Sequence, residues 1–208
     1  AAAAMLKGMT VQYLLTRTFM VQKGMTILFH AAAGGVGLIA GQWAKHLGAT
    51  VIGTVGSDDK IALARAHGYD HVFNMRKEDW VARVRELSGG EGLPVVYDSI
   101  GKDSWDGSLD CLAPRGLMVS FGNASGAVPP FAPGILASKG SLYLTRPSLL
   151  HYTRTRAELQ ETADDLFAVI ASGAVKIEVR QRFKLANAAD AHRALEGRKT
   201  TGATVLVP

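Results

Sequence analysis

The sequence predicts an α/β fold in which a six-stranded, doubly wound parallel sheet carries helices on both faces. Short apolar and β-branched runs alternate with longer segments that have apolar residues every three or four positions. Glycines stand where helices are expected to end, at Gly48, Gly68 and Gly89. The 208 residues are 48% hydrophobic and 20% charged, which is the balance of a globular protein with a sizeable core.

The expected elements follow one another without a repeat. A helix over residues 1–19 opens the chain and lacks a capping residue at its start. Strands are predicted over residues 26–30, 50–54, 71–73, 95–98, 116–121 and 141–145. Between them the apolar spacing predicts helices over 35–47, 58–67, 78–87 and 105–112. The crossovers are expected to be right-handed.

After residue 145 the pattern changes. We expect a long helix over 156–171, a strand over 175–183, a short helix over 188–195 and a last strand over 203–207. This tail does not continue the alternation, so we interpret it as part of a second, incomplete domain. The predicted division is residues 1–148 for the sheet domain and 149–208 for the C-terminal segment.

Charge and cysteine content restrict the possible partners. The net charge of +5 suits either nucleic acid or a polyanionic small molecule, but the cations are scattered among acids, which disfavours nucleic acid. No apolar run is long enough to span a membrane, and the start lacks the order of a signal peptide. The single Cys111 cannot form an internal disulfide. We therefore expect a cytoplasmic protein without membrane contacts.

A glycine-rich turn follows the first predicted strand. The run that ends at His30 leads into Ala32-Ala33-Gly34-Gly35-Val36-Gly37, which opens the next helix. Strand, glycine turn and helix in this order are typical of a Rossmann-type dinucleotide site. Gly34 lets the backbone approach a pyrophosphate, and Gly37 permits close packing of helix on strand. Ala32 stands where the usual pattern has its first glycine, so the match is imperfect.

The end of the second strand decides which dinucleotide is expected. An NAD site places a carboxylate there, whereas a 2′-phosphate needs a cation and hydrogen-bond donors. The strand ends at Thr54 without an acid, Ser57 can cap the next helix, and Lys60 lies one turn inside it. The alternative is that Asp58 binds the ribose. We prefer Asp58 as a first-turn acid favoured by the helix dipole, and we predict NADPH.

Other catalytic arrangements are not found in the sequence. No Tyr is followed four residues later by Lys, and the six histidines form no pair at that spacing on one helix. Nothing supplies the converging ligands of a zinc site, so no metal is predicted. Each histidine is interpreted as a surface or packing residue, and Cys111, beside Leu109 and Leu112, as a core residue. No catalytic residue is assigned.

Five segments carry a resemblance to a known family. They are residues 29–40, 53–57, 96–101, 115–123 and 140–148. In these segments the sequence resembles the zinc-independent quinone oxidoreductases of the medium-chain dehydrogenase/reductase superfamily, the group that includes zeta-crystallin. The match extends over nearly the whole chain. It implies an enzyme whose nicotinamide cofactor supplies the hydride.

The resemblance also implies a set of NADPH contacts. The implied contacts are Thr10, the glycine turn around Gly35 and Val36, and Gly56, Ser57 and Lys60 at the 2′-phosphate. They also include Ser99 near the ribose and Phe121, Gly122, Asn123 and Ala124 beside the nicotinamide. Arg146, Pro147, Ser148 and Arg198 complete the implied set. One position departs from the bacterial relatives. After Asn74 they usually carry a Tyr near the adenosine phosphate, whereas this chain has Met75.

Members of this family begin with a substrate-binding lobe, and the present chain resembles the part that follows it. We therefore expect the NADPH-binding part of a quinone reductase that has little activity by itself. A nucleotide-sensing module without turnover and a methyltransferase using another adenosine cofactor are the alternatives. The strand from Ser141 to Thr145 has no Pro or charge, so we expect it at an exposed sheet edge that pairs in a homodimer, as the resemblance also implies.

Overall fold

The computed structural model describes residues 1–197 and 199–208 and contains the predicted six-stranded parallel sheet. Its strand order is β3-β2-β1-β4-β5-β6, so the direction of winding reverses between β1 and β4. The strands are β1 (Thr26–Phe29), β2 (Thr50–Val55), β3 (His71–Asn74), β4 (Leu93–Asp98), β5 (Leu112–Ser120) and β6 (Tyr143–Thr145). The predicted fold class is confirmed.

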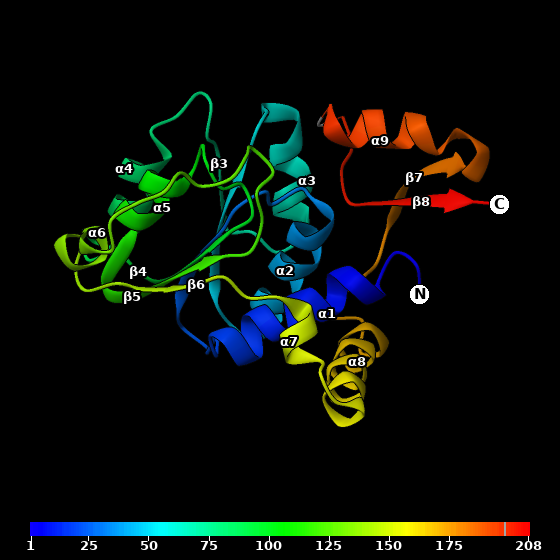
Figure 1. Ribbon diagram of the computed structural model, residues 1–208, viewed down its shortest axis with the longest axis horizontal. Coiled ribbons are helices and arrows are strands. Elements are labelled where there is room, and N and C mark those ends of the chain that lie inside the picture. The colour runs from blue at the N-terminus through cyan, green and yellow to red at the C-terminus, as the bar shows by residue number, and fades with distance from the viewer. Residues whose placement is uncertain (198) are drawn as a thin grey trace.

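Helices cover both faces of the sheet (Figure 1). The elements before β6 are α1 (Met5–Tyr13), η1 (Leu14–Thr18), α2 (Gly35–His46), η2 (Asp58–Lys60), α3 (Ile61–Ala66), α4 (Trp80–Leu87), α5 (Trp105–Asp110) and α6 (Gly134–Ser138). Successive residues of β1 serve opposite cores: Ile27 and Phe29 pack with α1 and α2, and Leu28 packs with α4 and α5. Strands buried on both faces explain why these runs are almost continuously apolar.

Several element boundaries differ from the prediction. The last sheet strand begins at Tyr143 rather than at residue 141, because Ser141 has a φ of +56° and its amide bonds to the Ala137 carbonyl at the end of α6. The strand predicted from residue 116 begins at Leu112, which pairs with Leu93 before a register shift. The helix predicted over 58–67 consists of the short η2 followed by α3.

The three glycines predicted to end helices are confirmed. Gly48, Gly68 and Gly89 follow their helices with φ values of +84°, +94° and +62°. The opening helix begins later than predicted, at Met5, and its last turn widens into the π-helix η1. Among the described helices, none combines the length and apolarity needed to cross a bilayer.

The tail forms α7 (Leu149–Tyr152), α8 (Arg156–Ala171), β7 (Val179–Lys184), η3 (Leu185–Asn187), α9 (Ala188–Glu196) and β8 (Ala203–Val207). A capping box of Thr155 and Glu158 starts α8. This helix packs on α1, where a Cβ added at Gly8 would meet Leu166 Cδ1 at 2.4 Å. Strands β7 and β8 form a separate parallel pair beside the sheet domain (Figure 1).

Candidate dinucleotide-binding site

The glycine turn joins β1 to α2 by a tight path. Ala31 adopts a left-handed φ of +54°, and Gly34 precedes α2 without a capping side chain. A Cβ added at Gly37 would lie 2.3 Å from the Ala31 carbonyl oxygen, so only glycine allows the helix to pack this closely on the strand, as predicted. The uncapped start of a 12-residue helix leaves amide donors for an anion.

The alanine at the first motif position fits because a glycine faces it. Ala32 is fully buried, and its Cβ would lie 2.7 Å from a Cβ added at Gly53 of β2. The space that a first glycine usually provides is therefore supplied by the neighbouring strand. The departure of Ala32 from the generic motif leaves the turn intact.

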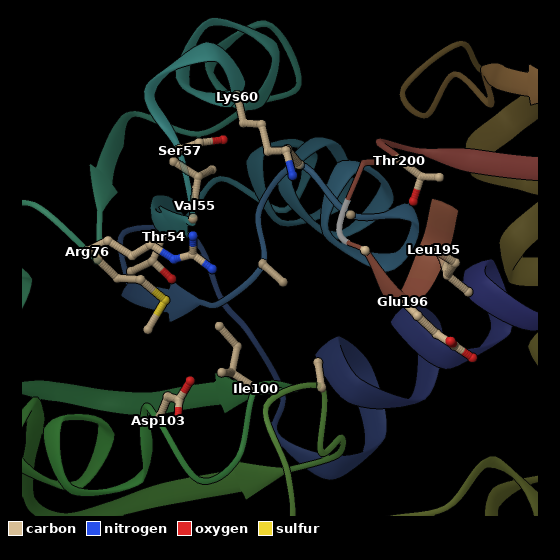
Figure 2. Close-up of a pocket in the computed structure, with 17 residues that line it drawn as sticks. Thr54, Val55, Ser57, Lys60, Arg76, Ile100, Asp103, Leu195, Glu196 and Thr200 are labelled. Atoms are coloured by element: carbon tan, nitrogen blue, oxygen red, sulfur yellow. The ribbon is translucent and has the colours of Figure 1, made fainter. Parts of the chain in front are cut away.

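A cavity of about 660 Å³ opens at the carboxyl ends of β1, β2, β3 and β4 (Figure 2). Its walls are Ala31, Ala33, Gly34, Thr54, Val55, Gly56, Ser57, Lys60, Met75, Arg76, Ile100, Asp103, Ala124, Leu195, Glu196, Gly197 and Thr200. The cavity lies where the strand order reverses, which is the usual ligand position in an open α/β sheet. Its size suits the adenosine and phosphate portion of a dinucleotide.

The cavity brings together part of the predicted contact set. Gly34, Gly56, Ser57, Lys60 and Ala124 line it. Beyond the lining lie Gly35, Val36 and Gly37 in the first turn of α2, Thr10 on α1, Ser99 after β4, Phe121, Gly122 and Asn123 after β5, and Arg146, Pro147 and Ser148 after β6. Arg198 is outside the described residues.

The predicted contacts after β4, β5 and β6 lie at the carboxyl ends of these three neighbouring strands. Ala124 donates its amide to the Ser99 carbonyl at 3.0 Å, and a Cβ at Gly122 would meet the same carbonyl oxygen at 2.6 Å. Arg146 donates to the Ser120 carbonyl at 2.8 Å and so fixes the end of β6 against β5. Thr10 is turned toward its own helix, where its hydroxyl donates to the Leu6 carbonyl at 2.7 Å.

The end of β2 differs in one respect from the prediction. Ser57 stands at the N-cap position of η2, but its hydroxyl makes no capping hydrogen bond and the residue lines the cavity instead. Asp58 lies outside the cavity wall and accepts hydrogen bonds from Asn74 Nδ2 and Lys77 Nζ, both at 2.5 Å. These two bonds lower the pKa of Asp58. Asp58 is thus held as a first-turn acid, the interpretation preferred from the sequence.

Three charged residues of the cavity, Arg76, Asp103 and Glu196, were missed by sequence reasoning. Arg76 follows β3 by two positions, and Asp103 follows β4 by five. In the sequence Arg76 is one of many scattered cations, and only its place after the end of a parallel strand sets it apart. Leu195, Glu196 and Thr200 of the tail were also missed, because no local pattern shows that the tail returns to the glycine turn.

A buried polar network lies beneath the cavity. His30 is fully buried, with its ring nitrogens 2.7 Å from Thr54 Oγ1 and 3.0 Å from Ser108 Oγ. Ser108 and Ser104 both donate to the Asp98 carboxylate at 2.7 Å. His30 is therefore a packing residue, as predicted, that also connects the ends of β1, β2 and β4 through hydrogen bonds.

Burial lowers the pKa of His30, so the ring is neutral at pH 7. For Asp98, burial by itself raises the pKa, but His30, the two serine hydroxyls and the Gly101 amide outweigh it and hold the pKa below its ordinary value. Cys111 is fully buried, and burial raises the pKa of its thiol to about 12, in keeping with the predicted core role.

The comparisons with known proteins agree with this geometry. The profile of the zinc-binding dehydrogenase family matches residues 35–169. The chain belongs to the zinc-binding dehydrogenase family. The resemblance to quinone oxidoreductases is confirmed by a Pseudomonas aeruginosa quinone oxidoreductase, which is 58% identical over all 208 residues of this chain. A Burkholderia 2-haloacrylate reductase is 48% identical over 208 residues, which are 62% of its length.

A solved quinone oxidoreductase structure has nearly the same fold as this chain. Escherichia coli quinone oxidoreductase crystallised with NADPH has a TM-score of 0.98 and 55% identity, and the match covers all of this chain and 64% of that one. The chain likewise spans 64% of the length of the Pseudomonas aeruginosa relative.

The family description implies zinc, which binds proteins through three or four converging His, Cys or carboxylate ligands. Within the described part of the chain, no three His, Cys, Asp or Glu side chains are grouped as metal ligands. The side chains of His30 and Cys111, which could in principle bind zinc, are otherwise engaged. Both ring nitrogens of His30 form hydrogen bonds with hydroxyl groups, and the Cys111 thiol is buried and protonated. These residues do not fit a zinc site.

Proposed function

We propose that this chain is the NADPH-binding part of an oxidoreductase that transfers a hydride from NADPH to a quinone. The observation that carries the proposal is the 660 Å³ cavity, which joins the glycine turn to two cationic side chains, Lys60 and Arg76. A helix start with a glycine turn suits a pyrophosphate, and cations beside it suit a further phosphate. The Escherichia coli relative crystallised with NADPH and the quinone oxidoreductase name of the Pseudomonas aeruginosa relative support the same cofactor and acceptor.

The nicotinamide supplies the hydride, so the protein has to hold the ring against the acceptor and exclude water. The predicted contacts after β5 and β6, including Phe121, Asn123 and Arg146, are proposed for this half of the cofactor. The chain spans 64% of the length of the Pseudomonas aeruginosa relative, and the family resemblance implies a preceding substrate-binding lobe, to which we assign the opposite wall of the cleft. NADPH oxidation by quinone at about 1 per second or faster with this chain alone would contradict that assignment.

Three further features belong to the proposal. The reaction is independent of zinc, since His30 and Cys111 are engaged in the core. The protein acts in the cytoplasm, in keeping with a single reduced cysteine. Residues 1–148 form the dinucleotide-binding domain, and residues 149–208 contain the part of a second domain, supported by the separate β7–β8 pair.

We also propose a homodimer through the edge of the sheet. Strand β6 is the last in the strand order, and Tyr143 is 63% exposed there. An uncovered edge carries unpaired backbone groups that a second copy can satisfy by two-fold pairing. This edge belongs to the cofactor domain, so the pairing does not depend on a preceding lobe.

Calorimetric titration of the chain with NADPH, NADH and S-adenosylmethionine tests the cofactor proposal. We expect NADPH to bind more tightly than NADH and S-adenosylmethionine not to bind. Lys60→Ala should weaken NADPH by roughly tenfold or more and NADH little, the loss expected for a charge-assisted contact. Lys23→Ala, at an exposed site outside the cavity wall, is the control. Equal losses for both cofactors would return the specificity role to Asp58, and binding of S-adenosylmethionine alone would overturn the proposal.

A further inference from the structure

The cavity has an uneven distribution of charge. Lys60 from η2 and Arg76 from the loop after β3 reach into it from neighbouring strand ends, while the acidic residues, Asp103 after β4 and Glu196 at the end of α9, line other parts of the wall (Figure 2). A phosphate group is attracted to the first side and repelled by the second. The adenosine portion therefore has one favourable orientation, with its phosphate toward Lys60 and Arg76 and its hydrogen-bond donors toward Asp103.

The side chain of Asn74 fixes the loop that carries Arg76. Asn74 is 2% exposed, and its Oδ1 accepts the Arg76 amide at 3.1 Å. The backbone N–H of Asn74 in turn donates to Glu78 Oε1 at 2.8 Å. With the backbone held in this way, the Arg76 side chain projects over Gly56, where its Nε would lie 3.9 Å from an added Cβ.

The neighbouring carboxylates are already engaged by other groups. Lys77 pairs with Asp58 at 2.5 Å, and Glu78 accepts from the Asn74 amide. Within the described part of the chain, no carboxylate lies within ion-pair distance of the Arg76 guanidinium. Of two consecutive cations, Lys77 pairs with Asp58 outside the cavity wall, and Arg76 lines the cavity.

The residue beside Arg76 cannot take this role. Met75 lines the same wall, and a thioether is only a weak acceptor. A guanidinium offers a planar fork of donors that matches two phosphate oxygens at once. On these grounds, and resting on the proposed NADPH binding, we propose that Arg76 binds the 2′-phosphate of the adenosine ribose together with Lys60 and is a determinant of NADPH over NADH.

The test compares Arg76→Ala with Lys77→Ala, which removes an adjacent cation that does not line the cavity. Calorimetry gives the Kd of each variant for NADPH, NADH, adenosine 2′,5′-bisphosphate and adenosine 5′-monophosphate. Arg76→Ala should weaken the two ligands with a 2′-phosphate by roughly tenfold and the other two by less than threefold. Lys77→Ala should change all four by less than threefold, and Arg76→Lys should recover part of the loss.

The outcomes separate the two proposals. Selective loss for the 2′-phosphate ligands supports the role of Arg76. Equal losses for NADPH and NADH, or no loss for either, overturn it while the NADPH proposal stands. If the wild-type chain binds neither NADPH nor adenosine 2′,5′-bisphosphate, both proposals fail. Circular dichroism of each variant shows whether a loss of binding reflects a loss of fold, and Arg76→Lys then provides the decisive comparison.

Discussion

Replacement of His30, which does not itself line the cavity, by Ala should strongly destabilise the fold. The imidazole is fully buried and packs at right angles to Trp80, with ring centroids 5.0 Å apart. Its loss leaves the buried Thr54 hydroxyl without its bond, which costs about 1–3 kcal/mol, and leaves a cavity that costs about 2 kcal/mol more. Ser108 keeps its bond to Asp98. We therefore expect the free energy of unfolding to fall by about 3–5 kcal/mol.

Urea denaturation followed by far-ultraviolet circular dichroism measures this loss without relying on the Trp80 ring, against which His30 packs. His46→Ala is the matched control, since this residue is exposed at the end of α2 and should change stability by less than about 0.5 kcal/mol. A loss below about 1 kcal/mol for His30→Ala would refute the view that the network holds the ends of β1, β2 and β4 together.

The same variant should alter the pH dependence of stability. Burial holds the pKa of His30 below its ordinary value of 6.5. Below pH 6.5 the unfolded chain therefore binds a proton at this residue more readily than the folded chain does. Stability from this group is complete above pH 6.5 and falls as the pH drops below it, by up to about 1.4 kcal/mol per pH unit. Asp98, whose pKa is also lowered, adds a second loss only below its ordinary value of 3.8. The decrease between pH 7.5 and 5.5 should therefore be smaller in His30→Ala than in the wild type and in His46→Ala.

Two further predictions concern the glycine turn and the sheet edge. Gly37→Ala should lower the free energy of unfolding by more than about 2 kcal/mol, because the new Cβ would lie 2.3 Å from a carbonyl oxygen. Gly134→Ala, with nothing within 4 Å, should not, and equal urea midpoints would contradict the packing argument. Tyr143→Pro should weaken the proposed dimer by disturbing the edge strand, whereas Tyr143→Thr should not. Light scattering that gives a monomer mass for the wild type would contradict edge pairing.

The sheet could be predicted because its strands are buried on both faces. Ile27, Leu28 and Phe29 are each at most 1% exposed, so the whole run had to be apolar and was visible as such. Boundaries were less predictable where backbone conformation decides them. Ser141 with its φ of +56° and Arg115 with a φ of +63° carry no residue-type signal for a left-handed turn. The first residues of β5 and β6 were therefore misplaced, although both strands were predicted.

The candidate site could be predicted to the extent that it follows local motifs. The glycine turn, Ser57 and Lys60 are close in sequence to strand ends and were identified. Arg76 was not, because its proposed role depends on Asn74 holding the loop after β3 and on which neighbouring cation is already paired with an acid. Pairing between charges is a property of three-dimensional position, so a count of scattered cations cannot show which of them faces the ligand.

The tail illustrates the same limit at a larger scale. Sequence pattern separates residues 149–208 from the sheet, yet the Gly202 amide donates to the Ala33 carbonyl at 3.0 Å and Gly202 forms a bridge with Gly34. Leu195, Glu196 and Thr200 consequently form the wall opposite β2 and β3. A cofactor bound at the glycine turn would contact a segment that leads into β8, and β8 pairs with β7 outside the sheet domain. The proposed boundary at residue 148 therefore divides the sequence without dividing the wall of the cavity.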